Sequence, residues 1–226
     1  MLLNLAQSDY HKYTWISQMS LLFALHNGCL TRETNSEIEL ILNNVYDTEA
    51  RFIVRGQDFE DVDRLYATVV TNKYDFLTEI ISRVPDLQVA TVVNVGAGIG
   101  VAAICLAKFL DNAVIRAFES NEADFDQLQR NLVLNAPINN RIAAYRQYGQ
   151  AVNAMDELDL LVCAAKSLSQ FPANEALVHL MVSTKIILVE SFPSSNDQNS
   201  FIECITKLGF QHEYADMSMV CWKPKG

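Results

Sequence analysis

The feature that most restricts the fold of this chain of 226 residues is the segment from Thr91 to Gly100. It begins with TVVNV, in which every residue but Asn94 is β-branched, and such a run is typical of a strand buried on both faces of a parallel sheet. Glycine then occupies positions 96, 98 and 100, and the apolar segment Val101–Leu110 follows as a predicted helix. A buried strand that leads through a glycine loop into a helix is typical of an open α/β sheet, so further strands and helices must surround it.

The rest of the chain continues this alternation, which predicts a parallel sheet with helices on its faces. Asn121 is a predicted helix cap, and Pro137 and Gly209 mark where two helices end. The predicted strands are Val114–Phe118, Arg141–Arg146, Leu158–Cys163 and Lys185–Glu190, followed by Phe210–Ala215 and Met217–Trp222, which a tight turn joins. The predicted helices are Glu122–Leu134, Pro172–Val182 and Ser200–Leu208.

Two amphipathic helices are predicted near the amino terminus. The first carries apolar residues at helical spacing from Trp15 to Phe23 and ends at Asn27. The second begins after Ser36, whose hydroxyl can cap it while Glu39, three residues later, completes a capping box. Its buried face would consist of Ile38, Ile41, Leu42 and Val45.

The early helices determine the predicted domain organisation. A short strand, Ala50–Val54, and helical stretches over Asp61–Arg83 follow them. The apolar faces of the two helices are too small to fold alone. We therefore expect residues 1–70 to form an N-terminal helical lid or extension on one α/β domain over 71–226.

Charge and cysteine usage restrict the partners. A formal net charge of −10 without a basic run argues against a general surface for nucleic acids or anionic membranes, because phosphate groups bind clustered Lys and Arg. The five cysteines never have zinc-binding spacing, which indicates reduced thiols in a cytoplasmic protein without a metal site. The apolar run Leu21–Leu25 is too short for a membrane span. We expect a cytoplasmic protein with neither nucleic-acid nor membrane partners.

The glycine loop is the first candidate ligand site. Glycine lets the backbone approach a ligand closely, and the start of the following helix offers N–H groups and the positive end of a dipole. The spacing is GxGxG rather than GxGxxG, which favours the amino-acid end of S-adenosylmethionine over a pyrophosphate. A turn that merely needs small residues is the alternative interpretation.

Glu119 supports the ligand interpretation. It ends the next predicted strand, 19 residues after Gly100. A carboxylate at this place can accept hydrogen bonds from both ribose hydroxyls of a nucleoside cofactor. NAD would satisfy the same acid, so loop and acid together leave both cofactors open.

The stretch from Val92 to Asn135 resembles the cofactor-binding half of the FkbM-type methyltransferases. That family has a DVGANIG loop, an FEP strand end and a helix ending LKRNLALN, and this chain reads NVGAGIG, FES and LQRNLVLN. Upstream, Ile53-Val54-Arg55, Asp61-Val62, Leu65 and Tyr74 resemble the family's preceding segment. The resemblance implies a class I methyltransferase fold: a Rossmann-like sheet with helices on both faces, here with a small N-terminal helical segment. Such a sheet differs from a dinucleotide-binding sheet in having an antiparallel strand near its carboxyl-terminal end, where this chain has the predicted strands Phe210–Ala215 and Met217–Trp222.

The resemblance also implies S-adenosyl-L-methionine as the cofactor. The three glycines would face its methionine part and Glu119 its ribose, and Ala97 and Ser120 are further cofactor-binding candidates. Asn94 stands where the family has an acid, and Gln147 and Tyr148 are candidates for the adenine edge. The candidate cofactor residues are Asn94, Gly96, Ala97, Gly98, Gly100, Glu119, Ser120, Gln147 and Tyr148.

The fourth strand departs from the family pattern. The family reads DLLKIDVEG and this chain DLLVCAAK, so that Val162, Ala164 and Lys166 replace a lysine and two acids if the registers correspond. Methyl transfer depends chiefly on positioning, but a hydroxyl acceptor must also lose a proton to a base. Glu190, at the end of the fifth strand, is the candidate catalytic base, and an exposed acid without a role is the alternative. Further candidates are His11, His26, His179 and His212.

The leading hypothesis is an S-adenosylmethionine-dependent methyltransferase. The resemblance alone implies its acceptor, a small-molecule hydroxyl of a sugar, a polyketide or a peptide-derived compound. The altered fourth strand favours an alternative, a catalytically degenerate methyltransferase-fold domain that serves binding or scaffolding. A third hypothesis is a nicotinamide-dependent oxidoreductase, which titration with S-adenosylhomocysteine and with NAD would distinguish.

Overall fold

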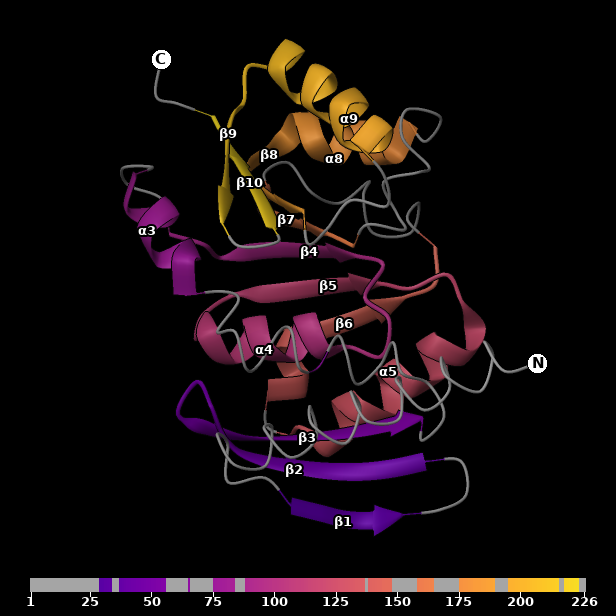
Figure 1. Cartoon of the computed structure of the whole chain (residues 1–226). Coiled ribbons are helices and arrows are strands. Elements are labelled where there is room, and N and C mark those ends of the chain that lie inside the picture. Colours follow the sequence, from indigo (N-terminus) through magenta and orange to yellow (C-terminus); the bar gives the residue numbers. More distant parts are fainter. Residues whose placement is uncertain are drawn as a thin grey trace, which may run out of the picture.

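The structure is a computed structural model that describes residues 29–33, 37–55, 65, 75–83, 88–136, 138–147, 158–164, 175–189, 195–215 and 218–223. Within these residues the chain forms a seven-stranded sheet, a three-stranded sheet and helices. Figure 1 shows helices α4 (Val101–Phe109) and α5 (Glu122–Leu134) between the two sheets. Helices α8 (Glu175–Ser183) and α9 (Ser195–Lys207) lie on the other face of the large sheet.

The large sheet has the strand order β6-β5-β4-β7-β8-β10-β9. Neighbours from β6 to β8 pair in parallel, and β10 is antiparallel to both β8 and β9. The order reverses at β4, and open α/β sheets bind ligands at such a reversal, outside the carboxyl ends of the strands. The strands are β4 (Thr91–Val95), β5 (Val114–Phe118), β6 (Ile142–Tyr145), β7 (Leu158–Cys163), β8 (Thr184–Val189), β9 (Gln211–Ala215) and β10 (Ser218–Trp222).

Both faces of this sheet are packed, as its β-branched central strand predicts. Val92 contributes to a core that α4 and α5 complete with Ile104 and Leu128. Val93 and Val95 contribute to a second core with α8 and α9. Successive residues of a strand point to opposite faces, so one short apolar strand serves both cores.

The predicted helix ends are largely confirmed. The Asn121 side chain accepts a hydrogen bond from the Asp124 N–H at 3.1 Å and so caps α5. Gly209, with φ of 81°, follows α9 in the left-handed conformation that commonly ends a helix. Helix α9 begins at Ser195 rather than at the predicted Ser200, so a polar segment before Ser200 forms its first turns. Two further helical elements are α3 (Asp75–Arg83) and the 3-10 helix η1 (Ile138–Arg141).

The helix predicted after Ser36 is wrong, because Glu37–Val45 is strand β2. It pairs antiparallel with β1 (Cys29–Glu33) and with β3 (Thr48–Arg55). The apolar residues satisfy two periods at once: positions 38, 41, 42 and 45 fit a helix, whereas 38, 40 and 42 fit a strand and are buried. A two-residue turn at Tyr46 and Asp47, both at positive φ, closes the β2–β3 hairpin and fixes the strand pairing.

The strands β1 to β3, here called the meander, form a layer of their own on the outer side of α4 and α5 (Figure 1). Leu40, Phe52 and Val54 belong to the same hydrophobic core as Ile99 and Leu128. The helix predicted between Trp15 and Phe23 lies outside the described residues. Among the helices described, none has the length and hydropathy that a membrane crossing requires.

Candidate functional site

The glycine loop (residues 96–100) connects β4 to α4 and adopts a conformation that requires glycine. Gly96, Gly98 and Gly100 have φ angles of 71°, 56° and 93°, a region that costs other residues about 1–2 kcal/mol each. Gly100 is also crowded, because a Cβ atom there would lie 2.6 Å from Leu128 Cδ1. The loop therefore lies directly against α5, and its course is set by its sequence.

Hydrogen bonds fold this loop across the carboxyl end of β5. The N–H groups of Gly96 and Ala97 both donate to the Phe118 carbonyl at 2.9 Å. The Gly98 N–H donates to Glu119 Oε2 at 2.7 Å. The structure thus brings the glycine loop and Glu119, both candidate cofactor residues, together at the carboxyl end of β5.

Glu119 is a buried carboxylate with fixed geometry. The residue is 8% exposed, and its second oxygen, Oε1, accepts a hydrogen bond from the Asn121 N–H at 2.8 Å. Its own N–H donates to the Tyr145 carbonyl of β6 at 3.0 Å. A carboxylate offers about four acceptor sites, so two remain for hydroxyl groups of a ligand.

The start of α4 suits an anionic group. Among the described residues, no side chain caps the helix at Gly100, and its first turn carries no acidic residue. The first intrahelical bond runs from the Ile104 N–H to the Gly100 carbonyl at 2.9 Å. The N–H groups of the first turn and the positive end of the helix dipole can therefore attract a carboxylate.

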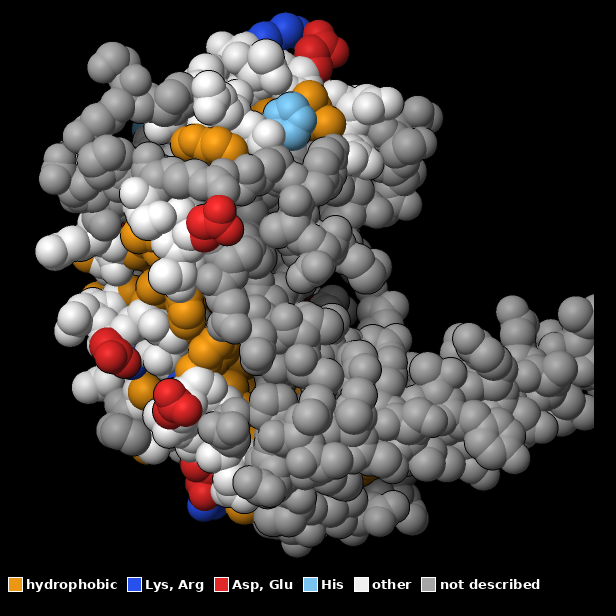
Figure 2. Space-filling view, turned by 60° about the vertical axis from the view of Figure 1, so that its left-hand side comes forward, with side chains coloured by type: hydrophobic (Ala, Val, Ile, Leu, Met, Phe, Trp, Pro, Cys, Tyr) orange, Lys and Arg blue, Asp and Glu red, His pale blue; other side chains and the backbone are white. Residues whose placement is uncertain are grey.

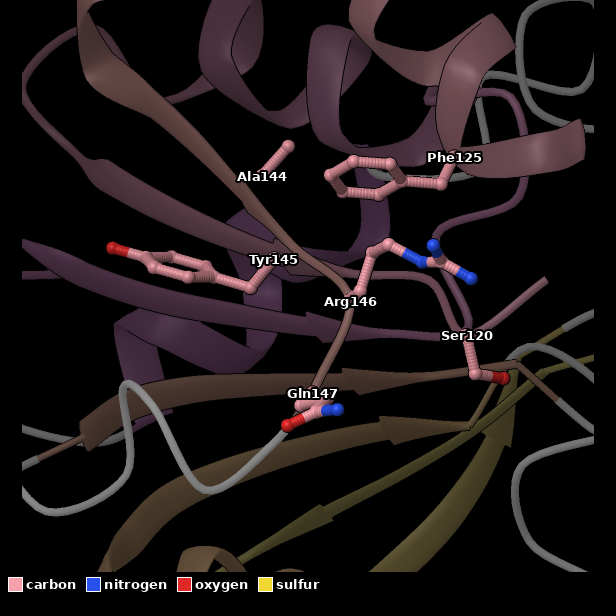
Figure 3. Close-up of a pocket in the computed structure, with 6 residues that line it drawn as sticks. All are labelled: Ser120, Phe125, Ala144, Tyr145, Arg146 and Gln147. Atoms are coloured by element: carbon pink, nitrogen blue, oxygen red, sulfur yellow. The ribbon is translucent and has the colours of Figure 1, made fainter. Parts of the chain in front are cut away.

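A cavity of about 680 Å³ lies next to Glu119, at the carboxyl ends of β5 and β6. In Figure 3, Phe125 and Arg146 project to one side of β6, while Tyr145 projects to the other. The Tyr145 ring stacks on Phe118, with ring centroids 5.3 Å apart. The lining residues are Ser120, Phe125, Ala144, Tyr145, Arg146 and Gln147. The Phe125 ring, with polar side chains of Ser120 and Gln147 near it, suits a flat heteroaromatic ring.

The structure brings the predicted cofactor residues into two adjoining groups. One group is the glycine loop with Glu119, and the other is the cavity, to which Ser120 and Gln147 contribute. Tyr148 lies outside the described residues. Sequence reasoning missed Phe125 and Arg146, although Phe125 is an aromatic residue in the first turn of α5, four residues after the predicted cap.

Asn94 is a buried polar residue of β4. It is 0% exposed and lies between Ala117 of β5 and Val162 of β7. Among the described residues, neither its Oδ1 nor its Nδ2 has a hydrogen-bond partner. An unsatisfied buried amide costs about 1–3 kcal/mol, so this position fits a water molecule or a polar group of a ligand.

The end of β7 is apolar. Val162 and Cys163 are both 0% exposed, and the Ala164 N–H donates to the Val95 carbonyl of β4 at 3.0 Å. The described part of this strand end, residues 162–164, therefore carries no carboxylate, lysine or histidine side chain. Lys166 and the predicted base Glu190 lie outside the described residues.

No protein-family model and no curated protein matches the sequence. Solved structures do match. A precorrin-6Y C5,15-methyltransferase from Geobacter metallireducens is 14% identical, with a TM-score of 0.51 over 65% of this chain and 86% of the other. Magnesium protoporphyrin IX methyltransferase from Synechocystis, crystallised with bound SAM, is also 14% identical, with a TM-score of 0.50 over 73% and 83% of the two chains. The METTL16 methyltransferase domain is 10% identical, with a TM-score of 0.52 over 71% and 69%.

These likenesses, together with the strand order and the antiparallel β10, show the fold. The chain has the class I methyltransferase fold, a Rossmann-like and mostly parallel sheet with helices on both faces. The part predicted as a small helical segment contains the meander where its second helix was expected. Fold alone does not specify chemistry, so activity has to be argued from the site.

Proposed function

We propose that this chain is an S-adenosylmethionine-dependent methyltransferase. The observation that carries the proposal is the Glu119 carboxylate, which the Gly98 N–H holds at 2.7 Å between the glycine loop and the cavity. Glu119 follows β5, the second strand of the nucleotide-binding unit that starts at β4, and a carboxylate at this place can accept hydrogen bonds from both ribose hydroxyls. The loop and the cavity then lie on the two sides of the ribose, as the methionine and adenine parts of the cofactor require.

The methionine side of the cofactor fits the glycine loop. Its carboxylate would meet the uncapped start of α4, and Ala97 and the glycines would contact it through their backbones. Asn94 offers a buried amide without a partner among the described residues, and a polar end of the ligand or its hydration water would satisfy it. When bound, the cofactor supplies a methyl group on an activated sulfonium.

The adenine side fits the cavity. Phe125 offers an apolar ring, while Ser120 and Gln147 offer polar groups at the rim. Tyr148, the next residue, is proposed to contribute to the same edge. The antiparallel β10 between β8 and β9 supports this cofactor over NAD, because a dinucleotide-binding sheet lacks such a strand.

For the acceptor we propose a small-molecule hydroxyl. Charge supports this choice over nucleic acid: the chain has a net charge of −10, and Figure 2 shows no gathering of described Lys and Arg side chains on the face it views. The proposed base is Glu190, which follows β8 directly. Val189 pairs with Cys163 of β7, and Cys163 with Val95 of β4, so β8 ends at the same edge of the sheet as the glycine loop.

The apolar end of β7 favours a second candidate function. Val162 and Cys163 are buried, and the described strand end places no carboxylate, lysine or histidine beside the proposed methyl position. A domain that keeps cofactor affinity but serves binding or scaffolding would have this character. Glu190 is therefore the residue on which the two candidates differ.

The test has two stages. Calorimetric titration of the full chain with S-adenosylhomocysteine and with NAD comes first, and the proposal expects binding of the former at a stoichiometry of one. Transfer of a labelled methyl group from S-adenosylmethionine to a panel of hydroxylated metabolites comes second. Binding of NAD alone would overturn the cofactor assignment, and cofactor binding without transfer to any acceptor would favour the second candidate.

A further inference from the structure

Helix α5 docks on strand β3 through buried side-chain amides. Asn131 and Asn135 are 0% and 4% exposed. The Ile53 N–H donates to Asn131 Oδ1 at 2.7 Å, and Asn131 Nδ2 donates to the Ile53 carbonyl at 3.2 Å. Asn135 makes the same pair of bonds with Arg51, at 3.0 Å and 2.6 Å. Each amide thus takes the place of a neighbouring strand at the edge of β3.

The helix and strand spacings explain this match. Residues four apart on a helix are separated by about 6 Å along its axis, and alternate residues of a strand by about 6.8 Å. Two successive turns of α5 therefore meet the outward-facing peptide groups of Arg51 and Ile53. An ion pair of 2.7 Å between Arg55 and Asp124 continues the contact at the end of the strand.

Asn131 differs from Asn135 in one further bond. Its Nδ2 also donates to the carbonyl of Ile99 at 2.9 Å, and Ile99 belongs to the glycine loop. The additional bond of Asn135 goes to the Asn131 carbonyl of its own helix, at 2.7 Å. One amide therefore joins α5, the meander and the glycine loop, whereas its neighbour joins only the first two.

We propose that Asn131 is a positioning residue that sets the glycine loop for cofactor binding and couples the loop to the meander. The part of this proposal that concerns cofactor binding rests on the proposed function. Ile99 lies between Gly98, whose N–H is bonded to Glu119, and Gly100, the N-cap of α4. Fixing the Ile99 carbonyl therefore fixes the peptide groups on which the ligand contacts depend.

The loop needs such a support because of its composition. Glycine has more backbone conformations to lose than any other residue, and three of the five loop residues are glycine. A loop without support must be ordered when the ligand binds, which lowers affinity. A loop that the Asn131 amide has already ordered avoids this loss. The meander in turn holds Asn131 in place through both bonds to Ile53.

The two asparagines provide a matched pair of variants. Asn131→Asp and Asn135→Asp each keep the Oδ1 acceptor and remove the Nδ2 donor to a β3 carbonyl, but only the first removes a bond to the loop. The readouts are the affinity for S-adenosylhomocysteine by calorimetry, the stability by urea denaturation, and hydrogen exchange of the loop amides in the ligand-free protein. If Asn131→Asp does not fold, Asn131→Ala is measured in the same three ways, because water can replace the amide in that variant.

Both variants should lose comparable stability. The Asn131 variant should also weaken S-adenosylhomocysteine binding about tenfold, which is the loss of one buried hydrogen bond, whereas Asn135→Asp should stay within about twofold. Loop amides should exchange faster in the Asn131 variant than in the wild type, and at the wild-type rate in Asn135→Asp. Equal affinities and equal loop exchange in the two variants would overturn the proposal.

The exchange measurement separates this proposal from the proposed function. If the wild type binds no S-adenosylhomocysteine, the proposed function fails. Faster loop exchange confined to the Asn131 variant then still supports the coupling of loop and meander, and unchanged exchange overturns it.

Discussion

Replacing Glu119 with alanine removes a proposed ribose acceptor and the anchor of the glycine loop at the same time. Hydrogen bonds to a charged group contribute about 1.5–3 kcal/mol, so affinity for S-adenosylhomocysteine should fall by about 10-fold to 150-fold. The Gly98 N–H, bonded to Glu119 at 2.7 Å, loses its acceptor. Leaving that buried donor unsatisfied should lower the free energy of unfolding by about 1–3 kcal/mol.

Calorimetric titration and urea denaturation of the same preparation measure both effects. Glu203→Ala is the control, since it removes an equal charge from a surface ion pair with Lys207 on α9. The control should leave affinity unchanged. An affinity of the Glu119 variant equal to that of the wild type would refute the assignment of this carboxylate to the ligand.

Other substitutions test the remaining parts of the site and of the fold. Gly100→Ala places a Cβ 2.6 Å from Leu128 Cδ1 at a φ of 93°, so urea denaturation should show a loss of about 1–3 kcal/mol, and unchanged stability would contradict the crowding. Burial raises the pKa of Asp159, but hydrogen bonds from Lys185 and from backbone amides outweigh it and lower that pKa. The stability that the lowered pKa contributes is present above the unfolded pKa and is lost as pH falls below about 4. Asp159→Asn should therefore flatten the acid limb of the profile of stability against pH. An unaltered acid limb would show that Asp159 is not the source of this stability. With an acceptor identified, Glu190→Gln should lower kcat by about 10²–10⁴ while S-adenosylhomocysteine affinity stays within a few-fold, and unaltered turnover would place the base elsewhere.

The sequence predicted the segment from Thr91 to Leu134 almost to the residue, because local and global signals agree there. The β-branched strand is buried on both faces, the glycines have positive φ and Asn121 caps α5. Where the signals conflict, the prediction failed. The apolar residues of Glu37–Val45 are compatible with a helix or a strand. The segment forms a strand because it pairs with β3, and β3 is in turn bound to α5, which is distant in the sequence.

In the candidate site, too, the residues marked by local signals could be predicted and those brought together by packing could not. Glu119 follows from its place at a strand end, since the strand and the glycine loop before it could be located from local signals. Phe125 and Arg146 could not be predicted, because the parallel pairing of β5 with β6 brings their elements together. The contact of Asn131 with Ile99 is of the same kind: it depends on the packing of α5 against the loop.

A crystal structure of the full chain grown with S-adenosylhomocysteine tests the central claim most directly. We expect both ribose hydroxyls within hydrogen-bond distance of the Glu119 carboxylate, the adenine ring in the cavity beside Phe125, and the amino-acid end at the glycine loop. Crystals grown with saturating ligand that show no ligand at Glu119, or show it bound elsewhere on the chain, would contradict the account.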